Sequence, residues 1–244
     1  VDRRQRQMCI RDRRWTVLCD FDGTIGLRDT IDTLLQRFGR PGWEALEDDW
    51  LAGRIGSRAC MRGQVALLDM DAAQFEQHLS GLDIDPAFPA FAAAVAARGW
   101  PLEIVSDGLD LPIRLLLARE GVAPLPLYAN RFHPVGERRW NLESPHQAPS
   151  CGAGTCKCAR AAQARRHAPG GQVLLVGDGT SDFCVAGRAD YVFAKRKLIA
   201  HCRDHALAHS AIEGFAEALA LLPALESGAL TRHAPLVSPA VAIA

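Results

Sequence analysis

The stretch LCDFDGTI, residues Leu18–Ile25, constrains this chain more than any other part of it. An apolar run that starts at Trp15 leads into two carboxylates one residue apart, and Gly-Thr follows. This pattern predicts a buried strand that ends in a tight turn. In an open α/β sheet, ligands bind outside the carboxyl ends of the strands, so Asp20 and Asp22 are expected to project into a crevice that a substrate can reach.

The spacing of these two aspartates indicates a cation site. Residues two apart on a strand point to the same side. Two carboxylates about 4 Å apart repel by roughly 4 kcal/mol at an effective dielectric constant near 20, so a site that holds both ionised usually also holds a cation. Asp-x-Asp-Gly also opens calcium-binding loops, but such a loop needs a glutamate at its twelfth position, where Ile31 stands.

Three further motifs follow along the chain. The run LEIVSDG is strand-like up to Ser106, Lys157 opens an amphipathic stretch, and VLLVGDGTSD, a further strand that runs into a turn, carries Asp178 and Asp182. Together with DFDGT, these motifs resemble the four signatures of the haloacid dehalogenase superfamily of aspartate-nucleophile phosphohydrolases. The resemblance covers about residues 17–194.

This resemblance implies a role for each motif residue. Asp20 would attack phosphorus and form an aspartyl-phosphate, while Asp22 would protonate the leaving alcohol and then deprotonate the attacking water. Lys157 would neutralise the phosphoryl group in the transition state. Mg²⁺ would be the cofactor, held by the oxygens of four residues: Asp20, Asp22 through its main-chain carbonyl, Asp178, and Asp182 directly or through water.

The second motif is expected to bind phosphate. The Ser106 hydroxyl and the backbone amides of Asp107 and Gly108, at a helix start, would donate hydrogen bonds to phosphate oxygens. Asp107 stands where related small-molecule phosphatases often have glycine. Its backbone amide keeps the implied role, whereas the role of its side chain is left open.

Residues 29–85 have a helical pattern, with four segments that read IDTLLQRF, GWEALEDDWLAG, SRACMRGQVALL and DAAQFEQHL. The superfamily inserts a helical cap here, whose inner face covers the active site. Asp29 matches an acidic position near the substrate. Arg58 and Arg62 are candidate substrate contacts, although both could equally be solvated on an amphipathic helix. Three large side chains at helical spacing are expected to form the cap core: Trp43, Trp50 and Met61.

The rest of the pattern predicts an α/β fold with a doubly wound parallel sheet, because strands and helices alternate along it. A hairpin is expected around residues 134–136, and two helices close the fold. We assign residues 14–28 and 86–225 to this core domain, 29–85 to the helical cap and 226–244 to a flexible tail. The arginine-rich leader, residues 1–13, is expected to be non-native or disordered rather than a nucleic-acid-binding arm.

Charge and hydropathy exclude several classes of partner. Lysine plus arginine equals aspartate plus glutamate at 28 each, so no global field favours nucleic acid or an acidic membrane surface. No apolar run approaches the ~20 residues that span a bilayer. The expected partner is a small phosphate ester, with no nucleic acid or membrane, and the expected state is a monomer or homodimer in the cytoplasm.

The eight cysteines suit a reducing compartment. Cys151, Cys156 and Cys158 surround Lys157, and with a fourth ligand such as His146 they could bind zinc, but their spacing matches no standard zinc knuckle pair. The loop is therefore expected to be metal-free and to position Lys157.

The predicted function is Mg²⁺-dependent hydrolysis of a small phosphorylated metabolite. The cysteine- and glycine-rich loop, the cap pattern LAGRIGSRACMRGQVALL and the run YVFAK followed by LIAHCRDH resemble the methionine-salvage subfamily that acts on 2-hydroxy-3-keto-5-methylthiopentenyl-1-phosphate. Phosphoserine phosphatase is the alternative within enzymes. A non-catalytic phosphate-binding protein is the alternative of another class, but such a protein usually lacks an essential carboxylate, and all are present here.

Overall fold

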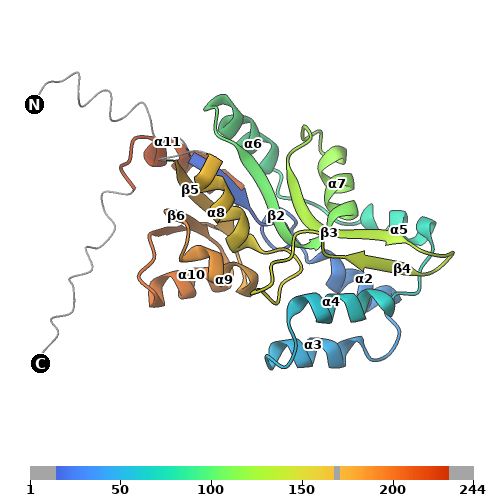
Figure 1. Cartoon of the computed structure of the whole chain (residues 1–244). Coiled ribbons are helices and arrows are strands. Elements are labelled where there is room, and N and C mark those ends of the chain that lie inside the picture. Colours follow the sequence, from blue (N-terminus) through green and yellow to red (C-terminus); the bar gives the residue numbers. More distant parts are fainter. Residues whose placement is uncertain (1–14, 168–170, 231–244) are drawn as a thin grey trace, which may run out of the picture.

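The computed structural model describes residues 15–167 and 171–230 (Figure 1). The predicted leader, residues 1–13, lies outside the described residues, as does most of the predicted tail. No described helix is both long enough and apolar enough to cross a membrane.

Seven strands form one sheet in the order β4-β3-β2-β1-β5-β6-β7. Neighbouring strands are parallel, except that β3 and β4 form an antiparallel hairpin. β1 lies at the centre of the sheet, and the chain winds outward from it on both sides. The prediction of a doubly wound α/β sheet is therefore confirmed. The strands are β1 Trp15–Cys19, β2 Leu102–Leu109, β3 Leu127–Pro134, β4 Trp140–Glu143, β5 Gln172–Gly177, β6 Tyr191–Ala194 and β7 His209–Ala211.

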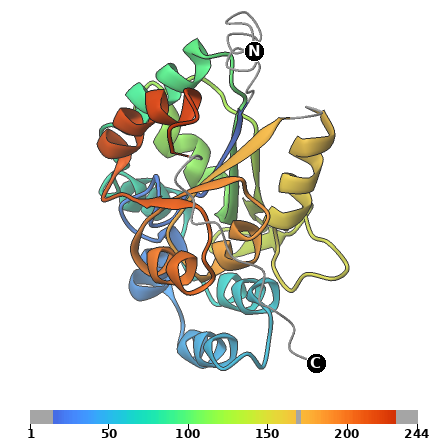
Figure 2. The same ribbon diagram turned by 90° about the vertical axis from the view of Figure 1, so that its left-hand side faces the viewer.

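Helices cover both faces of the sheet, because successive residues of the central strands face opposite layers. Val17 and Cys19 of β1 pack into the core under α6, α7 and α11, whereas Leu18 packs into the core under α8, α9 and α10. Figure 2 shows these two layers, with the red helix α11 on one side of the sheet and the gold helix α8 on the other. The core helices are α6 Phe88–Ala97, α7 Asp110–Arg119, α8 Lys157–His167, α9 Phe183–Ala186, α10 Arg196–Asp204 and α11 Phe215–Glu226.

Four helices lie between β1 and α6: α2 Thr30–Phe38, α3 Trp43–Leu51, α4 Ser57–Ala66 and α5 Ala72–Leu79. Local capping explains two of their starts. Asp29 accepts a hydrogen bond from the backbone amide of Asp32, and Asp71 forms a capping box with Gln74. α3 and α4 stand beyond one end of the sheet in both views (Figures 1 and 2).

Three elements differ from the sequence prediction. β2 does not end at Ser106 but runs on to Leu109 through a register shift. The helix expected over SDFCVAGRA is only a 3₁₀ turn, Thr180–Asp182, followed by the short α9. The three-residue strand β7 was missed, because so short a segment carries no period that sequence patterns can detect.

Candidate active site

The carboxyl ends of β1, β2 and β5 open into one cavity of about 410 Å³. These three strands are neighbours at the centre of the sheet, so residues far apart in sequence meet there. The core side of the cavity is lined by Asp20, Asp22, Gly23, Ser106, Asp107, Gly108, Asp178, Gly179, Thr180, Ser181, Arg196 and Lys197. The structure thus brings together residues of the first, second and fourth motifs.

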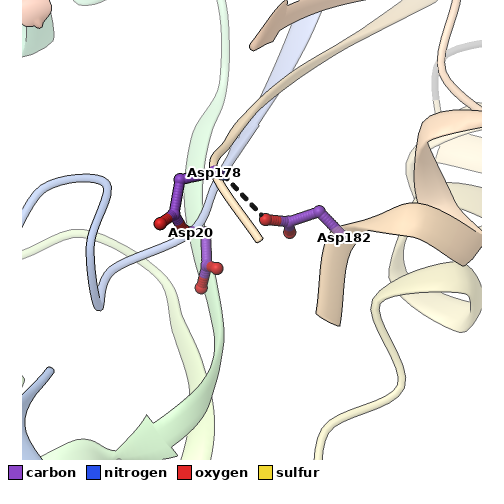
Figure 3. Close-up of side chains that lie close together, drawn as sticks. All are labelled: Asp20, Asp178 and Asp182. Carbon is purple, nitrogen blue, oxygen red and sulfur yellow. Dashed lines mark hydrogen bonds between the residues drawn. The ribbon is translucent and has the colours of Figure 1, made fainter. Parts of the chain in front are cut away.

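Asp20, Asp178 and Asp182 form a carboxylate cluster at this edge (Figure 3). One oxygen from each lies within 4.8 Å of the others. Burial and then the Asp182 charge raise the pKa of Asp20 and of Asp178, because converging carboxylates in a desolvated site repel. Hard oxygen donors of this kind are the ligands that Mg²⁺ prefers, so the residues present fit that ion.

Lys157 begins α8 and reaches into the same cluster. Its Nζ lies 2.7 Å from Asp20 Oδ2 and 2.7 Å from Asp182 Oδ1, and it donates to Ser181 Oγ at 3.0 Å. Burial acts to lower the pKa of Lys157, but the Asp182 and Asp20 carboxylates outweigh it and raise the pKa above its ordinary value. The side chain therefore stays an ammonium although it is only 3 % exposed.

One carboxylate oxygen of Asp22 is hydrogen-bonded to Thr30, and the other lies beside the second motif. Its Oδ1 accepts from the backbone amide of Thr30 at 3.0 Å and from the Thr30 hydroxyl at 2.9 Å. Its Oδ2 lies so close to Gly108 that a Cβ there would come within 2.1 Å of it. Burial raises the pKa of Asp22, and the hydrogen bonds from Thr30 act in the opposite sense. Glycine at position 108 is what lets this carboxylate approach β2.

Gly23 makes the turn after β1 possible. Its φ is +72°, a left-handed conformation that residues with a Cβ adopt only with strain. A Cβ at this position would also meet Asp178 Oδ2 at 2.4 Å. The Asp-Gly-Thr turn predicted from the sequence therefore passes close to Asp178, just beyond the end of β5.

The second motif differs from its sequence interpretation. Asp107 and Gly108 do not lie at a helix start, because α7 begins only at Asp110 and both residues belong to the extended end of β2. The backbone amide of Gly108 donates to Ser106 Oγ at 3.0 Å. The Ser106 hydroxyl and this strand end still face the cavity.

The side of the cavity formed by residues 29–64, here called the cap side, does not include the two arginines that were candidate substrate contacts. Neither Arg58 nor Arg62 lines it; Arg58 donates to Gln147 Oε1, and Arg62 is exposed. The lining face of α4 carries residues at helical spacing, and the two arginines lie on another side of the same helix. On the cap side the cavity is lined by Asp29, Ile31, Asp32, Glu47, Trp50, Ser57, Cys60, Met61 and Gln64.

Two of these lining residues, Trp50 and Met61, were expected to form the cap core. Both line the cavity, and Met61 also packs against the main core. Trp43 does not line the cavity and packs, partly buried, against the main core. Several lining residues of α4 were not predicted from the sequence. The spacing i, i+3, i+4, i+7 from Ser57 is the signal that would have identified this face of the helix.

Arg196 and Lys197 were also missed, although they follow the strand YVFA directly and so belong to the same edge of the sheet. Arg196 Nη1 lies 3.5 Å from Asp178 Oδ2. The signal that could have found them is the rule already used for the aspartates, that the carboxyl ends of parallel strands meet at one edge.

The cysteine loop, residues 144–156, leads to Lys157 and is held by backbone hydrogen bonds within the loop. The backbone amide of Cys156 donates to the carbonyl of His146 at 3.0 Å. Asp20, Asp178 and Asp182 are the only described group of three or more His, Cys, Asp or Glu residues whose ligand atoms converge. No metal site at the cysteines emerges from the described part of the chain.

A model of the haloacid dehalogenase-like hydrolases matches residues 17–187. The chain belongs to this family. This haloacid dehalogenase-like hydrolase is 32 % identical over 220 residues to 2-hydroxy-3-keto-5-methylthiopentenyl-1-phosphate phosphatase of Geobacillus kaustophilus, with 88 % of this chain and 98 % of the relative covered. The enzyme of the same name from an Exiguobacterium species is 30 % identical over 203 residues, covering 82 % of this chain and 93 % of that one.

The fold of the hydrolase is also found in solved structures. A probable phosphoserine phosphatase from Vibrio cholerae superposes with a TM-score of 0.65 at 16 % identity, covering 91 % of this chain and 67 % of that one. A likeness at such low identity concerns the fold alone. The family match and the named relatives identify the protein as a haloacid dehalogenase-type phosphatase.

Proposed function

We propose that this phosphatase hydrolyses a small phosphate monoester through an aspartyl-phosphate on Asp20, with Mg²⁺ as cofactor. The observation that carries the proposal is the convergence of Asp20, Asp178, Asp182 and Lys157 in one cluster. Asp20 and Asp178 line the same cavity as Asp22. A purely phosphate-binding protein would have no use for so many carboxylates at an anion site, because they repel the ligand.

Asp20 is the proposed nucleophile. Its Oδ1 accepts from the backbone amide of Phe21 at 2.8 Å, and its Oδ2 contacts Lys157, so the carboxylate is held in one orientation at the end of β1. Attack on phosphorus splits one difficult displacement into two easier ones. Lys157 supplies positive charge where the phosphoryl group gathers negative charge.

Asp22 is the proposed proton carrier. Because Thr30 holds its Oδ1, the Oδ2 beside Gly108 is free to protonate the leaving oxygen and later to take a proton from water. Asp182 is better placed to orient than to bind the ion, since its Oδ2 accepts from the backbone amides of Asp178 and Gly179 at 3.0 and 3.3 Å. The ligands we propose are the carboxylates of Asp20 and Asp178 and the main-chain carbonyl of Asp22. Bound Mg²⁺ would offset the charge of these carboxylates and of the phosphoryl oxygens.

The substrate we propose is the methionine-salvage ester named for the relatives. Its methylthio group is apolar and its phosphate is the only charged group, which suits a cap lining that includes Trp50 and Met61. Phosphoserine fits less well, because its carboxylate would need a cation. Among the described residues, the cap side of the cavity carries acidic and neutral side chains, and the cations Arg196 and Lys197 stand on the core side.

Two substitutions test the mechanism. Asp20→Asn removes the nucleophile, so turnover of an aryl phosphate should fall to background and no phosphoenzyme should form. Asp22→Asn keeps an oxygen for the Thr30 hydrogen bonds but removes the proton carrier. With a good leaving group, which hardly needs protonation, this variant should phosphorylate slowly and then stall.

Intact-mass measurement after rapid quenching should therefore find one added phosphoryl group on Asp22→Asn and none on Asp20→Asn. Asp83→Asn makes the same chemical change at a side chain that is 75 % exposed and should behave as the unsubstituted enzyme. Substantial turnover by Asp20→Asn would refute the proposed nucleophile.

A further inference from the structure

Protein donors hold both oxygens of the Asp107 carboxylate, although it borders the cavity. Its Oδ1 accepts from the backbone amides of Gly154 at 2.8 Å and Thr155 at 2.9 Å, and its Oδ2 accepts from the Ser57 hydroxyl at 2.5 Å. A side chain that recognised substrate would leave an oxygen unoccupied. These three donors come from two segments that are far from Asp107 in sequence.

The first segment is the cysteine loop, and it leads directly to Lys157. Thr155 is 1 % exposed, so the amides that Asp107 accepts from belong to a buried stretch of backbone two residues before the lysine. Asn130 links the start of the loop to the same strand end. Its Nδ2 donates to the Asp107 carbonyl at 2.6 Å, and its Oδ1 accepts from Ser144 Oγ at 2.7 Å. The loop is thus fixed where it begins and where it ends.

The second segment is the cap helix α4, whose first residue is Ser57. The two segments also touch each other, because the backbone amide of Arg58 donates to the carbonyl of Gly152 at 3.0 Å. α4 carries the cavity-lining face of the cap. One carboxylate at the end of β2 therefore bonds both to the approach to Lys157 and to the helix that faces the substrate.

We propose that Asp107 is a positioning residue that couples the seating of α4 to the placement of Lys157. The proposal rests on the proposed function for the catalytic role of Lys157. The hydrogen bonds of Asp107 do not depend on that function. Its consequence is that a shift of the cap changes the position of Lys157 relative to Asp20. The negative charge of Asp107 is not used on the substrate.

Paired substitutions at position 107 separate positioning from charge. In Asp107→Asn, the amide oxygen can accept from Gly154 and Thr155 while the amide nitrogen donates to the Ser57 hydroxyl, so each of these three bonds keeps a partner. Asp107→Ala loses all three. We expect kcat/KM for an aryl phosphate to fall at least about tenfold in Asp107→Ala and to stay within about threefold in Asp107→Asn.

Hydrogen–deuterium exchange provides a readout that does not depend on activity. In Asp107→Ala, peptides that cover residues 150–156 and 55–60 should exchange faster, and in Asp107→Asn they should not. Asp110→Ala is the matched control: it removes a carboxylate near the same strand end, one that accepts from the backbone amide of Phe132 at 2.9 Å. It should lower the melting temperature without faster exchange in either peptide.

If Asp107→Ala does not fold, the Ser57→Ala variant tests the coupling in its place. It removes a donor on the cap, yet the coupling predicts faster exchange in residues 150–156 as well. Equal loss of activity in the Asn and Ala variants, or unchanged exchange at 150–156 in Asp107→Ala or Ser57→Ala, would overturn the proposal. Absence of phosphatase turnover in the unsubstituted enzyme would refute the proposed function instead, and the exchange results would still test the coupling.

Discussion

Asp182 organises the site at the scale of single residues. It is completely buried, and its two oxygens serve different partners: Oδ1 accepts from Lys157, while Oδ2 accepts from the backbone amides of Asp178 and Gly179. One side chain therefore sets both the position of the lysine and the path of the backbone that presents Asp178. This arrangement explains why the aspartate four residues after Asp178 belongs to the site although it follows the strand end.

The aspartates of the cluster oppose one another, and this has a consequence for stability. Burial, followed by the charge of Asp182, raises the pKa of Asp178 above its unfolded value. A carboxyl with a raised folded-state pKa stabilises the fold below its ordinary pKa, and that contribution is lost as the pH rises through the folded-state pKa. At neutral pH without metal, ionised Asp178 therefore costs stability.

Asp178→Asn should raise the melting temperature of the metal-free protein at pH 7, because it removes this repulsion. It should also abolish the stabilisation by Mg²⁺, which for the unsubstituted protein is expected to be about 5–10 °C at ~100 times the dissociation constant. Thermal scans with EDTA and with Mg²⁺ check both. Asp83→Asn should leave the Mg²⁺ shift intact, and an intact shift in Asp178→Asn would remove Asp178 from the metal site.

At the scale of elements, α4 presents different chemistry to the cavity and to solvent. Ser57, Cys60, Met61 and Gln64 lie on the cavity face, and Gln64 Nε2 donates to Glu47 Oε2 of α3 at 2.9 Å. Arg62 is exposed. The helix therefore presents an apolar and neutral stripe to the cavity, and its arginines do not line it.

Met61→Ala should raise KM for the methylthio ester by about threefold to tenfold, because a lost apolar contact of this size is worth roughly 1 kcal/mol. Turnover of 4-nitrophenyl phosphate should change less than twofold, since the core residues that carry the reaction are untouched. Arg62→Ala, on another side of the helix, should change neither. An equal loss on both esters in Met61→Ala would show that α4 acts on the reaction rather than on substrate choice.

At the scale of the whole molecule, the site depends on a sheet with helix layers on both faces. α11 closes the layer over α6 through aromatic contacts: the Phe215 ring lies 4.9 Å from that of Phe88 and 5.0 Å from that of Phe91. All three side chains are buried. This packing lies on the face of the sheet and not at the edge that holds the carboxylates.

Phe215→Ala should lower the free energy of unfolding by about 3–5 kcal/mol, because it empties a buried aromatic site. The fraction that remains folded should keep kcat within about twofold at 25 °C. Urea unfolding and steady-state kinetics on the same preparation measure both quantities. Leu51→Ala, at a side chain position that is 68 % exposed, should change stability by less than about 0.5 kcal/mol. A large fall in kcat with unchanged stability in Phe215→Ala would show that α11 couples to the site.

Sequence alone predicted the central strand and most of the order of elements, although β7 was missed, and the family resemblance was needed to single out Lys157. Strand and helix periods are local properties, so the apolar run before Asp20 and the alternation of strands and helices could be interpreted without coordinates. The rule that ligands bind at the carboxyl ends of parallel strands then placed Asp20 and Asp178 at one edge. Both observations depend only on patterns within about ten residues.

Tertiary structure alone decided which side chains face the cavity and which are saturated. The helical period is 3.6 residues, so whether Arg58 or Met61 of α4 faces the substrate depends on how the whole helix is rotated against the core, which no local pattern states. The hydrogen bonds of Asp107 join three segments separated by tens of residues. Such contacts form because packing brings the segments together, and the sequence around any one of them carries no trace of its partners.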